Sequence, residues 1–166
     1  MIKRNMRVIG IDPGTVHCGY GIVEGFDGKQ YYLKADSVNI PRGGSFPERL
    51  NRLYTGLEDI IDQYSPDQLA IERIFYSKSI RSALALGHMR GIALLLAAKK
   101  GIEVFEYSPL EVKMAVVGYG RAEKRQVQEM VKAIFNLGER LKEDASDALA
   151  IALCHLNSMK LKGVGL

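Results

Sequence analysis

The chain contains few of the residues that build disulfide frameworks or zinc sites. Its 166 residues include two cysteines and three histidines. Cys18 and Cys154 do not have the spacing of a metal-binding pair, and two cysteines make no disulfide framework. His17, His88 and His155 are scattered along the chain, and we interpret them as structural. Disulfide-stapled scaffolds and zinc proteins are therefore disfavoured.

Long hydrophobic runs are lacking as well. The longest uninterrupted apolar run covers residues 91–98 and stops at Lys99 and Lys100. A membrane-spanning helix needs about 20 apolar residues, so we expect none here. Residues 1–6 carry charge, but no apolar segment with a cleavage site follows them, and no secretory signal is expected. The expected location is the cytoplasm.

Composition and charge favour a globular protein with a polyanionic partner. Hydrophobic residues make up 47% and charged residues 25% of the chain, and we expect residues 1–166 to form a single domain. The formal net charge of +4 favours nucleic acid only weakly. The distribution of the basic residues is more informative, because many follow the first third of the chain: Lys78, Arg81, Lys113, Arg121, Lys124, Arg125 and Lys132.

The predicted elements are those of an α/β domain with a mixed sheet. Three leading strands separated by Gly-bearing turns are expected to pair antiparallel, and two later strands joined through helices should be parallel. Ser45 with Glu48, and Ser108 with Glu111, have the capping-box spacing that opens a helix. Strands are expected at 7–12, 19–24, 31–38, 69–71 and 103–107, and helices at about 45–65, 79–100, 108–118, 122–137 and 144–159.

The helix expected at 79–100 leaves two interpretations open. Beyond Ile92 its apolar residues lie nearly all round, so both sides require cover. One side can lie on the sheet. The other side can meet a second subunit or be buried within the domain, and the residues alone favour neither.

Four carboxylates far apart in the sequence form the main candidate site. Asp12 and Glu72 each end a short apolar run, while Asp144 and Asp147 begin an alanine-rich helix. Strand ends and a helix start can converge in space, and an all-oxygen ligand set suits Mg²⁺ or Mn²⁺. Such a site on a basic protein predicts metal-dependent cutting of nucleic acid.

Each carboxylate also has a structural interpretation. Asp12 opens a Pro-Gly turn, Glu72 can form a surface salt bridge, and Asp144 suits an N-cap with Asp147 at the third helical position. The glycines that follow Asp12 resemble the phosphate loop of actin-like ATPases, but that family needs two large lobes and this chain is too short. The coincidence of four sites favours the catalytic interpretation.

In that interpretation two divalent ions, about 3.5–4 Å apart, activate a water and stabilise the leaving oxygen of a phosphodiester. Asp12, at the end of the expected central strand, is the candidate to bridge the ions. Glu72 would hold one ion, and Asp144 with Asp147 would hold the other.

Basic and aromatic residues supply candidate nucleic-acid contacts. Lys113 and Lys124 can neutralise phosphates, although most such lysines are simply solvated. Phe75 and Tyr76 follow Glu72 closely, and exposed aromatics beside basic residues can stack on unpaired bases. They can equally anchor the loop against the core. The full set of predicted contacts is Phe75, Tyr76, Lys78, Arg81, Lys113, Arg121 and Lys124.

Taken together, these motifs resemble the RuvC family of Holliday junction resolvases, within the RNase H-like superfamily. The resemblance runs from about residue 6 to residue 155 in the right order. It rests on residues 10–15, 19–21, 70–75, 82–87, 90–91, 104–107, 112–113, 116–118, 122–124 and 144–150.

The resemblance implies an RNase H-like sheet and a homodimer that resolves four-way DNA junctions by paired symmetric nicks, in recombination and repair. It places Asp12, Glu72, Asp144 and Asp147 on the family's catalytic quartet, with Mg²⁺ or a substituting Mn²⁺ and two ions expected per subunit. It matches Lys113 and Lys124 to basic residues near the active site, and Phe75 to an aromatic that contacts the junction. It also implies dimerisation through the long helix, with the branch-migration proteins RuvA and RuvB as partners.

Three competing hypotheses remain. The first is an RNase H-like nuclease that acts on another substrate, such as an RNA–DNA hybrid. The second is a non-catalytic, structure-specific DNA-binding module whose carboxylates are caps and salt bridges. The third is a small actin-like nucleotide-binding fragment.

Overall fold

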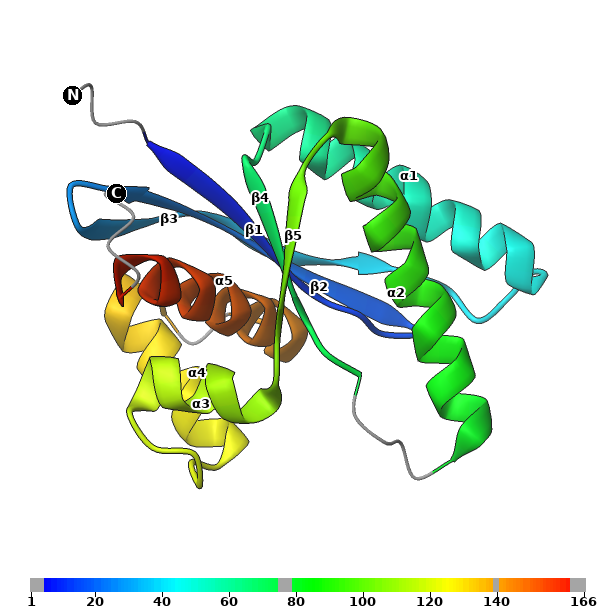
Figure 1. Cartoon of the computed structure of the whole chain (residues 1–166). Helices are drawn as coiled ribbons and strands as arrows, with labels where there is room; N and C mark the ends of the chain where they lie inside the picture. The colour runs from blue at the N-terminus through cyan, green and yellow to red at the C-terminus, as the bar shows by residue number, and fades with distance from the viewer. Residues whose placement is uncertain (1–4, 75–78, 139–140, 162–166) are drawn as a thin grey trace.

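A five-stranded mixed sheet forms the centre of the molecule (Figure 1). The computed structural model describes residues 5–74, 79–138 and 141–161. The strands are β1 (Met6–Asp12), β2 (His17–Phe26), β3 (Lys29–Asn39), β4 (Gln68–Glu72) and β5 (Glu103–Tyr107). Their order is β3-β2-β1-β4-β5, with antiparallel pairing from β1 to β3 and parallel pairing of β1 with β4 and of β4 with β5. The predicted mixed sheet is confirmed, and β1 is its central strand.

The described helices also agree with the predicted order. They are α1 (Phe46–Tyr64), α2 (Ile80–Lys100), α3 (Pro109–Val117), α4 (Lys124–Phe135) and α5 (Glu143–Leu161). Both predicted capping boxes form, because the Ser45 and Ser108 side chains accept from the third helical amide while Glu48 and Glu111 accept from the cap amide. The prediction for the end of α4 was wrong, since Asn136, at φ 52°, and not Gly138 adopts the left-handed conformation after the last turn.

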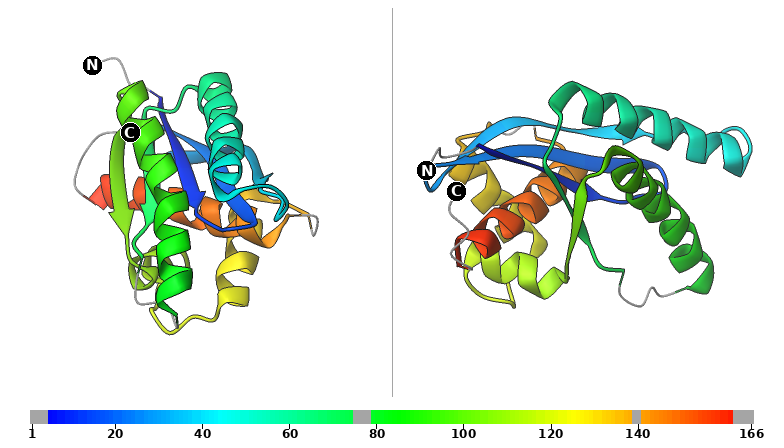
Figure 2. Two further views of the ribbon diagram at one scale, coloured as in Figure 1. Left: turned by 90° about the vertical axis from the view of Figure 1, so that its right-hand side faces the viewer. Right: turned by 45° about the horizontal axis from the view of Figure 1, so that its top comes forward.

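Helices cover both faces of the sheet and produce two hydrophobic cores. Figure 2 shows α1 and α2 on one side and α3, α4 and α5 on the other. Alternation along β1 assigns its side chains to the two cores: Ile9 and Ile11 pack with α1 and α2, whereas Val8 packs with α5. Because Asp12 lies in phase with Val8, its side chain is on the α5 side.

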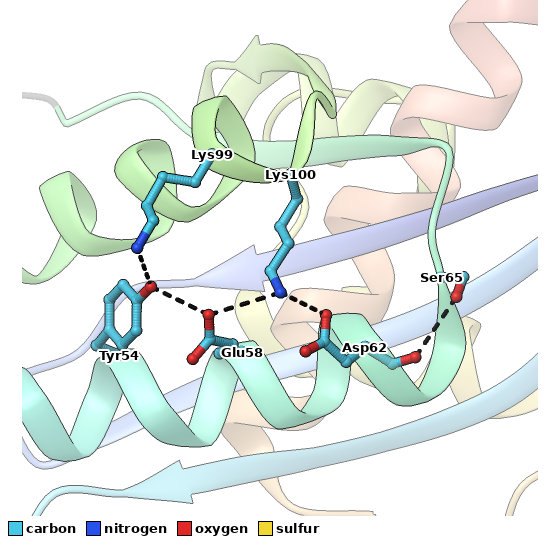
Figure 3. Close-up of polar contacts among 6 residues, drawn as sticks. All are labelled: Tyr54, Glu58, Asp62, Ser65, Lys99 and Lys100. Atoms are coloured by element: carbon cyan, nitrogen blue, oxygen red, sulfur yellow. Dashed lines mark hydrogen bonds and ion pairs between the residues drawn. The ribbon is translucent and has the colours of Figure 1, made fainter.

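Polar contacts fasten the C-terminal end of α2 to α1 (Figure 3). Lys99 Nζ donates to the Tyr54 hydroxyl over 2.6 Å, and that hydroxyl donates to Glu58 over 3.0 Å. Lys100 Nζ lies 2.7 Å from Asp62 Oδ1 and 3.5 Å from Glu58 Oε1. The last turn of α2 is therefore held in place by two neighbouring cations.

The long helix α2 covers the sheet with one side only. Met89, Ala93 and Leu96 are buried in the core, as expected for the sheet-facing side. On the helix, Ile80, Leu84 and Leu95 are 77%, 61% and 51% exposed. By length and composition alone α2 could cross a membrane, which the sequence analysis did not expect, but its buried residues belong to the core beneath the sheet. The part of the chain that the structure describes leaves much of the second side uncovered.

Helix α5 lies close against β1 and β2 because glycines face it. A Cβ added to Gly10 would come within 2.1 Å of the Ala148 carbonyl oxygen, and one on Gly19 within 2.0 Å of the Asp144 carbonyl oxygen. A Cβ on Gly21, which pairs with Gly10, would come within 2.8 Å of the Leu149 side chain. Gly19 and Gly21, which suggested a nucleotide loop, therefore serve helix packing.

We expect Gly10→Ala to destabilise the fold by about 1–3 kcal/mol, because the added methyl group meets helix backbone that must shift. Urea denaturation would measure the change. Gly43→Ala is the matched control, since a Cβ on Gly43 meets nothing within 4 Å. Equal stability of the two variants would contradict the proposed close approach.

Candidate active site

The register of the sheet brings Asp12 and Glu72 together. Ile11 pairs with Ile71 in the parallel β1–β4 ladder, so the two acids follow side by side at the same edge of the sheet. Across the β1–β2 ladder, Asp12 pairs with Gly19. Since Gly19 lies under the Asp144 carbonyl, the first turn of α5 is next to Asp12. Distant carboxylates thus converge through ordinary strand pairing.

Three of the four predicted acids and two predicted lysines line one cavity of about 340 Å³. Its wall is built from the ends of β1 and β4 and from α3, α4 and α5. A second cavity of about 190 Å³ adjoins Asp12 and Glu72 on the side of α2. The first cavity is lined by Asp12, Glu72, Pro109, Val112, Lys113, Lys124, Val127, Asp147, Ala150 and Ile151.

Asp144 lies in the first turn of α5 and is not its N-cap, so its alternative structural interpretation was wrong. The helix begins one residue earlier, at Glu143, because the Ser146 amide already donates to the Lys142 carbonyl. Asp144 does not line the cavity, but its charge contributes to raising the pKa of the Asp12 carboxyl. The fourth acid is therefore close enough to act on the cluster electrostatically.

Burial and mutual repulsion make the acids costly to ionise together. Burial, followed by the charges of Asp147, Glu72 and Asp144, raises the pKa of Asp12 to about 7. Burial and Asp147 likewise raise the pKa of Glu72, while Lys124 and Lys113 oppose the rise. Burial raises the pKa of Asp147 against the opposing effect of Lys124. The cluster carries more negative charge than its lysines compensate.

This donor set fits a divalent cation. Carboxylate oxygens are the preferred ligands of Mg²⁺ and Mn²⁺, and a bound cation would relieve the repulsion that raises the pKa of Asp12. Among the described residues no three His, Cys, Asp or Glu side chains are yet grouped closely enough to hold an ion. Lys124 Nζ lies 2.8 Å from Asp147 Oδ2 instead.

Two residues at the site were missed by the sequence analysis. Glu143 pairs with Lys124 at 2.6 Å, and its only sequence signal is its position four residues before Asp147 on one helix face. Arg90 donates from Nε to the Glu72 carbonyl over 3.4 Å and pairs with Glu106 at 2.8 Å. Arg90 thereby ties the end of β4 to α2 and β5. It belongs to a recognised motif, but nothing in the sequence gave it a role.

The other predicted contacts are distributed around the cavities. Arg121 is exposed in the turn between α3 and α4, and Arg81 is exposed in the first turn of α2. Neither lines the two cavities beside the acids. Phe75, Tyr76 and Lys78 lie outside the described residues.

The structure agrees with the structural interpretation of His155. Its ring is fully buried, with Nδ1 2.7 Å from the Tyr107 hydroxyl and Nε2 2.7 Å from Gln68 Oε1. His88 packs edge-on against Phe46, with ring centroids 5.3 Å apart.

The fold and the acidic cavity together define a nuclease of the RNase H-like type. The family model of the crossover junction endodeoxyribonuclease RuvC matches residues 8–155. This chain belongs to the RuvC family.

Relatives of known name and structure agree over nearly the full chain. The RuvC of Ruminiclostridium cellulolyticum is 49% identical over 157 residues, covering 94% of this chain and 95% of that protein. The RuvC of Geotalea uraniireducens is 46% identical over 159 residues, covering 96% and 93%. The structure of Thermus thermophilus RuvC in complex with a Holliday junction substrate superposes with a TM-score of 0.88 at 32% identity, covering 95% and 96% of the two chains. The yeast mitochondrial resolvase Ydc2, at 20% identity and a TM-score of 0.68, shares the fold.

We expect Asp12→Asn to stabilise the metal-free protein at high pH. A folded-state pKa of about 7, above the ordinary 3.8, means that ionised Asp12 opposes folding once the pH rises through that range. The increase in the free energy of unfolding over wild type should be absent near pH 4 and grow to at most about 4 kcal/mol above pH 7. Urea denaturation in EDTA at several pH values would measure it.

Asp36→Asn is the matched control for this series. Its hydrogen bond with Lys142 lowers the pKa of Asp36, so its ionised form favours folding and the substitution should bring no gain. A pH profile shared by both variants would refute the special environment of Asp12.

Proposed function

We propose that this chain acts as a crossover junction endodeoxyribonuclease, hydrolysing phosphodiester bonds at four-way DNA junctions during recombination and repair. The observation that carries the proposal is the cavity in which Asp12, Glu72 and Asp147 meet Lys113 and Lys124. Membership of the RuvC family supports it. The relative from Thermus thermophilus was solved with a Holliday junction substrate, which supports the same substrate here.

The proposed division of labour follows from the residues around the cavity. Asp12, Glu72, Asp144 and Asp147 would hold Mg²⁺ or Mn²⁺, with two ions per subunit and Asp12 as the shared ligand. When bound, such ions activate a water and stabilise the leaving oxygen. Asp12 and Glu72 stand at the ends of two strands, and Asp144 and Asp147 stand on α5, so these three elements would direct the four carboxylates toward the ions.

The two cavity lysines and the other predicted contacts would bind the DNA. Lys113 on α3 and Lys124 on α4 line the cavity that the scissile DNA strand would enter. They would offset the negative charge of the phosphates of that strand. The predicted contacts Phe75, Tyr76, Lys78, Arg81 and Arg121 would bind more distant parts of the junction.

We further propose a homodimer of single-domain subunits, each spanning residues 1–166. The uncovered side of α2, with Ile80, Leu84 and Leu95 exposed, supports a subunit contact there. Two sites related by a twofold axis could then nick two equivalent strands. The proposal extends to the cytoplasm as location and to RuvA and RuvB as partners.

Cleavage of a synthetic four-way junction, labelled on each strand in turn, tests this function. We expect paired symmetric nicks in Mg²⁺, none in EDTA and none on a linear duplex. Asp12→Asn should abolish cleavage and keep junction binding, because loss of a negative charge does not weaken contact with phosphate. Asp36→Asn, the same substitution outside the cavity, should cut normally.

Other outcomes would favour the competing hypotheses. Tight junction binding with no cleavage in Mg²⁺ or Mn²⁺ would favour the non-catalytic binding module. Preferred cleavage of an RNA–DNA hybrid would favour a different nuclease. Loss of both binding and cleavage in Asp12→Asn would indicate misfolding.

Arg90→Gln should slow junction cleavage about 10- to 100-fold, the usual effect of removing a residue that orients a metal ligand. The variant loses the link between Glu72 and Glu106 but leaves the cavity lysines in place. Single-turnover rates would measure the effect on cleavage, and junction binding in EDTA would measure any separate effect on affinity. Arg90→Lys, which retains the charge opposite Glu106, should recover part of the rate. Equal rates for wild type and Arg90→Gln would rule out this role.

A further inference from the structure

The ammonium group of Lys124 lies between two carboxylates of α5. It is 2.6 Å from Glu143 Oε1 and 2.8 Å from Asp147 Oδ2. Asp147 lines the cavity and its side chain is only 19% exposed, whereas Glu143 is 62% exposed and does not line it. Lys124 therefore connects an acid of the candidate active site to one outside it.

Lys124 serves as a resident counter-ion for the acids. Its charge opposes the rise in the pKa of Asp12, of Glu72 and of Asp147. The Lys124 side chain is 59% exposed and has many rotamers to lose. Without Glu143, Asp147 would be the one carboxylate of this pair left to keep it in place. A second carboxylate one helical turn before Asp147 restricts that motion from the solvent side.

We propose that Glu143 is a positioning residue that, together with Asp147, holds Lys124 at the mouth of the cavity and so makes its charge less available to DNA phosphates in the metal-free protein. This inference rests on the proposed function and adds a residue to it. Glu143 keeps the ammonium where a phosphate would enter. It also lowers the affinity of the metal-free protein for phosphate, since both hydrogen-bonded partners of Lys124 compete with DNA.

A matched comparison separates this role from a general effect of charge. Glu129 on α4 has the same exposure as Glu143, 62%, and pairs with Lys132 at 3.3 Å. Glu129→Gln therefore removes one exposed carboxylate and one lysine pair without touching Lys124. Glu143→Gln removes the same charge beside Lys124.

The test measures binding of an uncleaved junction and of a linear duplex in EDTA over a series of salt concentrations. At low salt Glu143→Gln should bind about two- to fivefold more tightly than wild type, the change expected on loss of one exposed ion pair. The slope of log affinity against log salt should steepen by up to about 0.9, the value of one added phosphate contact. Glu129→Gln should leave the slope unchanged. In a Lys124→Gln background the effect of Glu143→Gln should disappear.

The inference would be overturned if Glu143→Gln and Glu129→Gln gained equally in DNA affinity. It would also be overturned if the gain in Glu143→Gln persisted in the Lys124→Gln background. A readout without DNA tests the pairing directly. Glu143→Gln and Lys124→Gln should be non-additive by a factor of about two to five in the unfolding equilibrium constant. Full additivity would overturn the inference even if the wild type bound no DNA. Failure of the wild type to cut a junction in Mg²⁺ would instead refute the proposed function.

Discussion

The close approach of α5 to β1 and β2 is the constraint on which the site depends. Gly10 and Gly19 leave room for helix backbone where any side chain would collide. Because Gly19 pairs with Asp12, the same contact fixes where the first turn of α5 lies relative to the central strand. Packing and chemistry are therefore determined by one set of residues. The acids gather because the helix carrying two of them can lie directly on the sheet.

That arrangement places like charges where water is scarce. Burial and neighbouring acids raise the pKa of Asp12 to about 7, so the metal-free fold carries an electrostatic cost at its centre. Lys124 offsets part of it through Asp147. Proteins commonly accept such local instability at functional sites, and here the two large apolar cores on either side of the sheet supply the compensation.

Local signals made most of the fold predictable from sequence. The capping boxes at Ser45 and Ser108 depend on residues three apart, and both form as predicted. Helix ends were predicted less well where two nearby residues could each adopt the left-handed conformation. At the end of α4 that residue is Asn136 and not Gly138. The acids could be found because strand ends and apolar runs mark them. Arg90 could not be assigned a role, because its partners on β4 and β5 are distant in sequence.

The attachment of α2 has a mechanical consequence. The helix is tied to α1 through Lys99 and Lys100 at its C-terminal end (Figure 3), and Arg90 in its middle donates to the Glu72 carbonyl. Because the ties to α1 lie at one end, we expect a tilt of α2 to pivot near that end. A tilt imposed on the outer side of α2 would therefore be largest toward Ile80, and Arg90 is one of the contacts that would carry it to the acids. The helix has the geometry of a lever whose fulcrum lies far from the site and whose arm passes beside it.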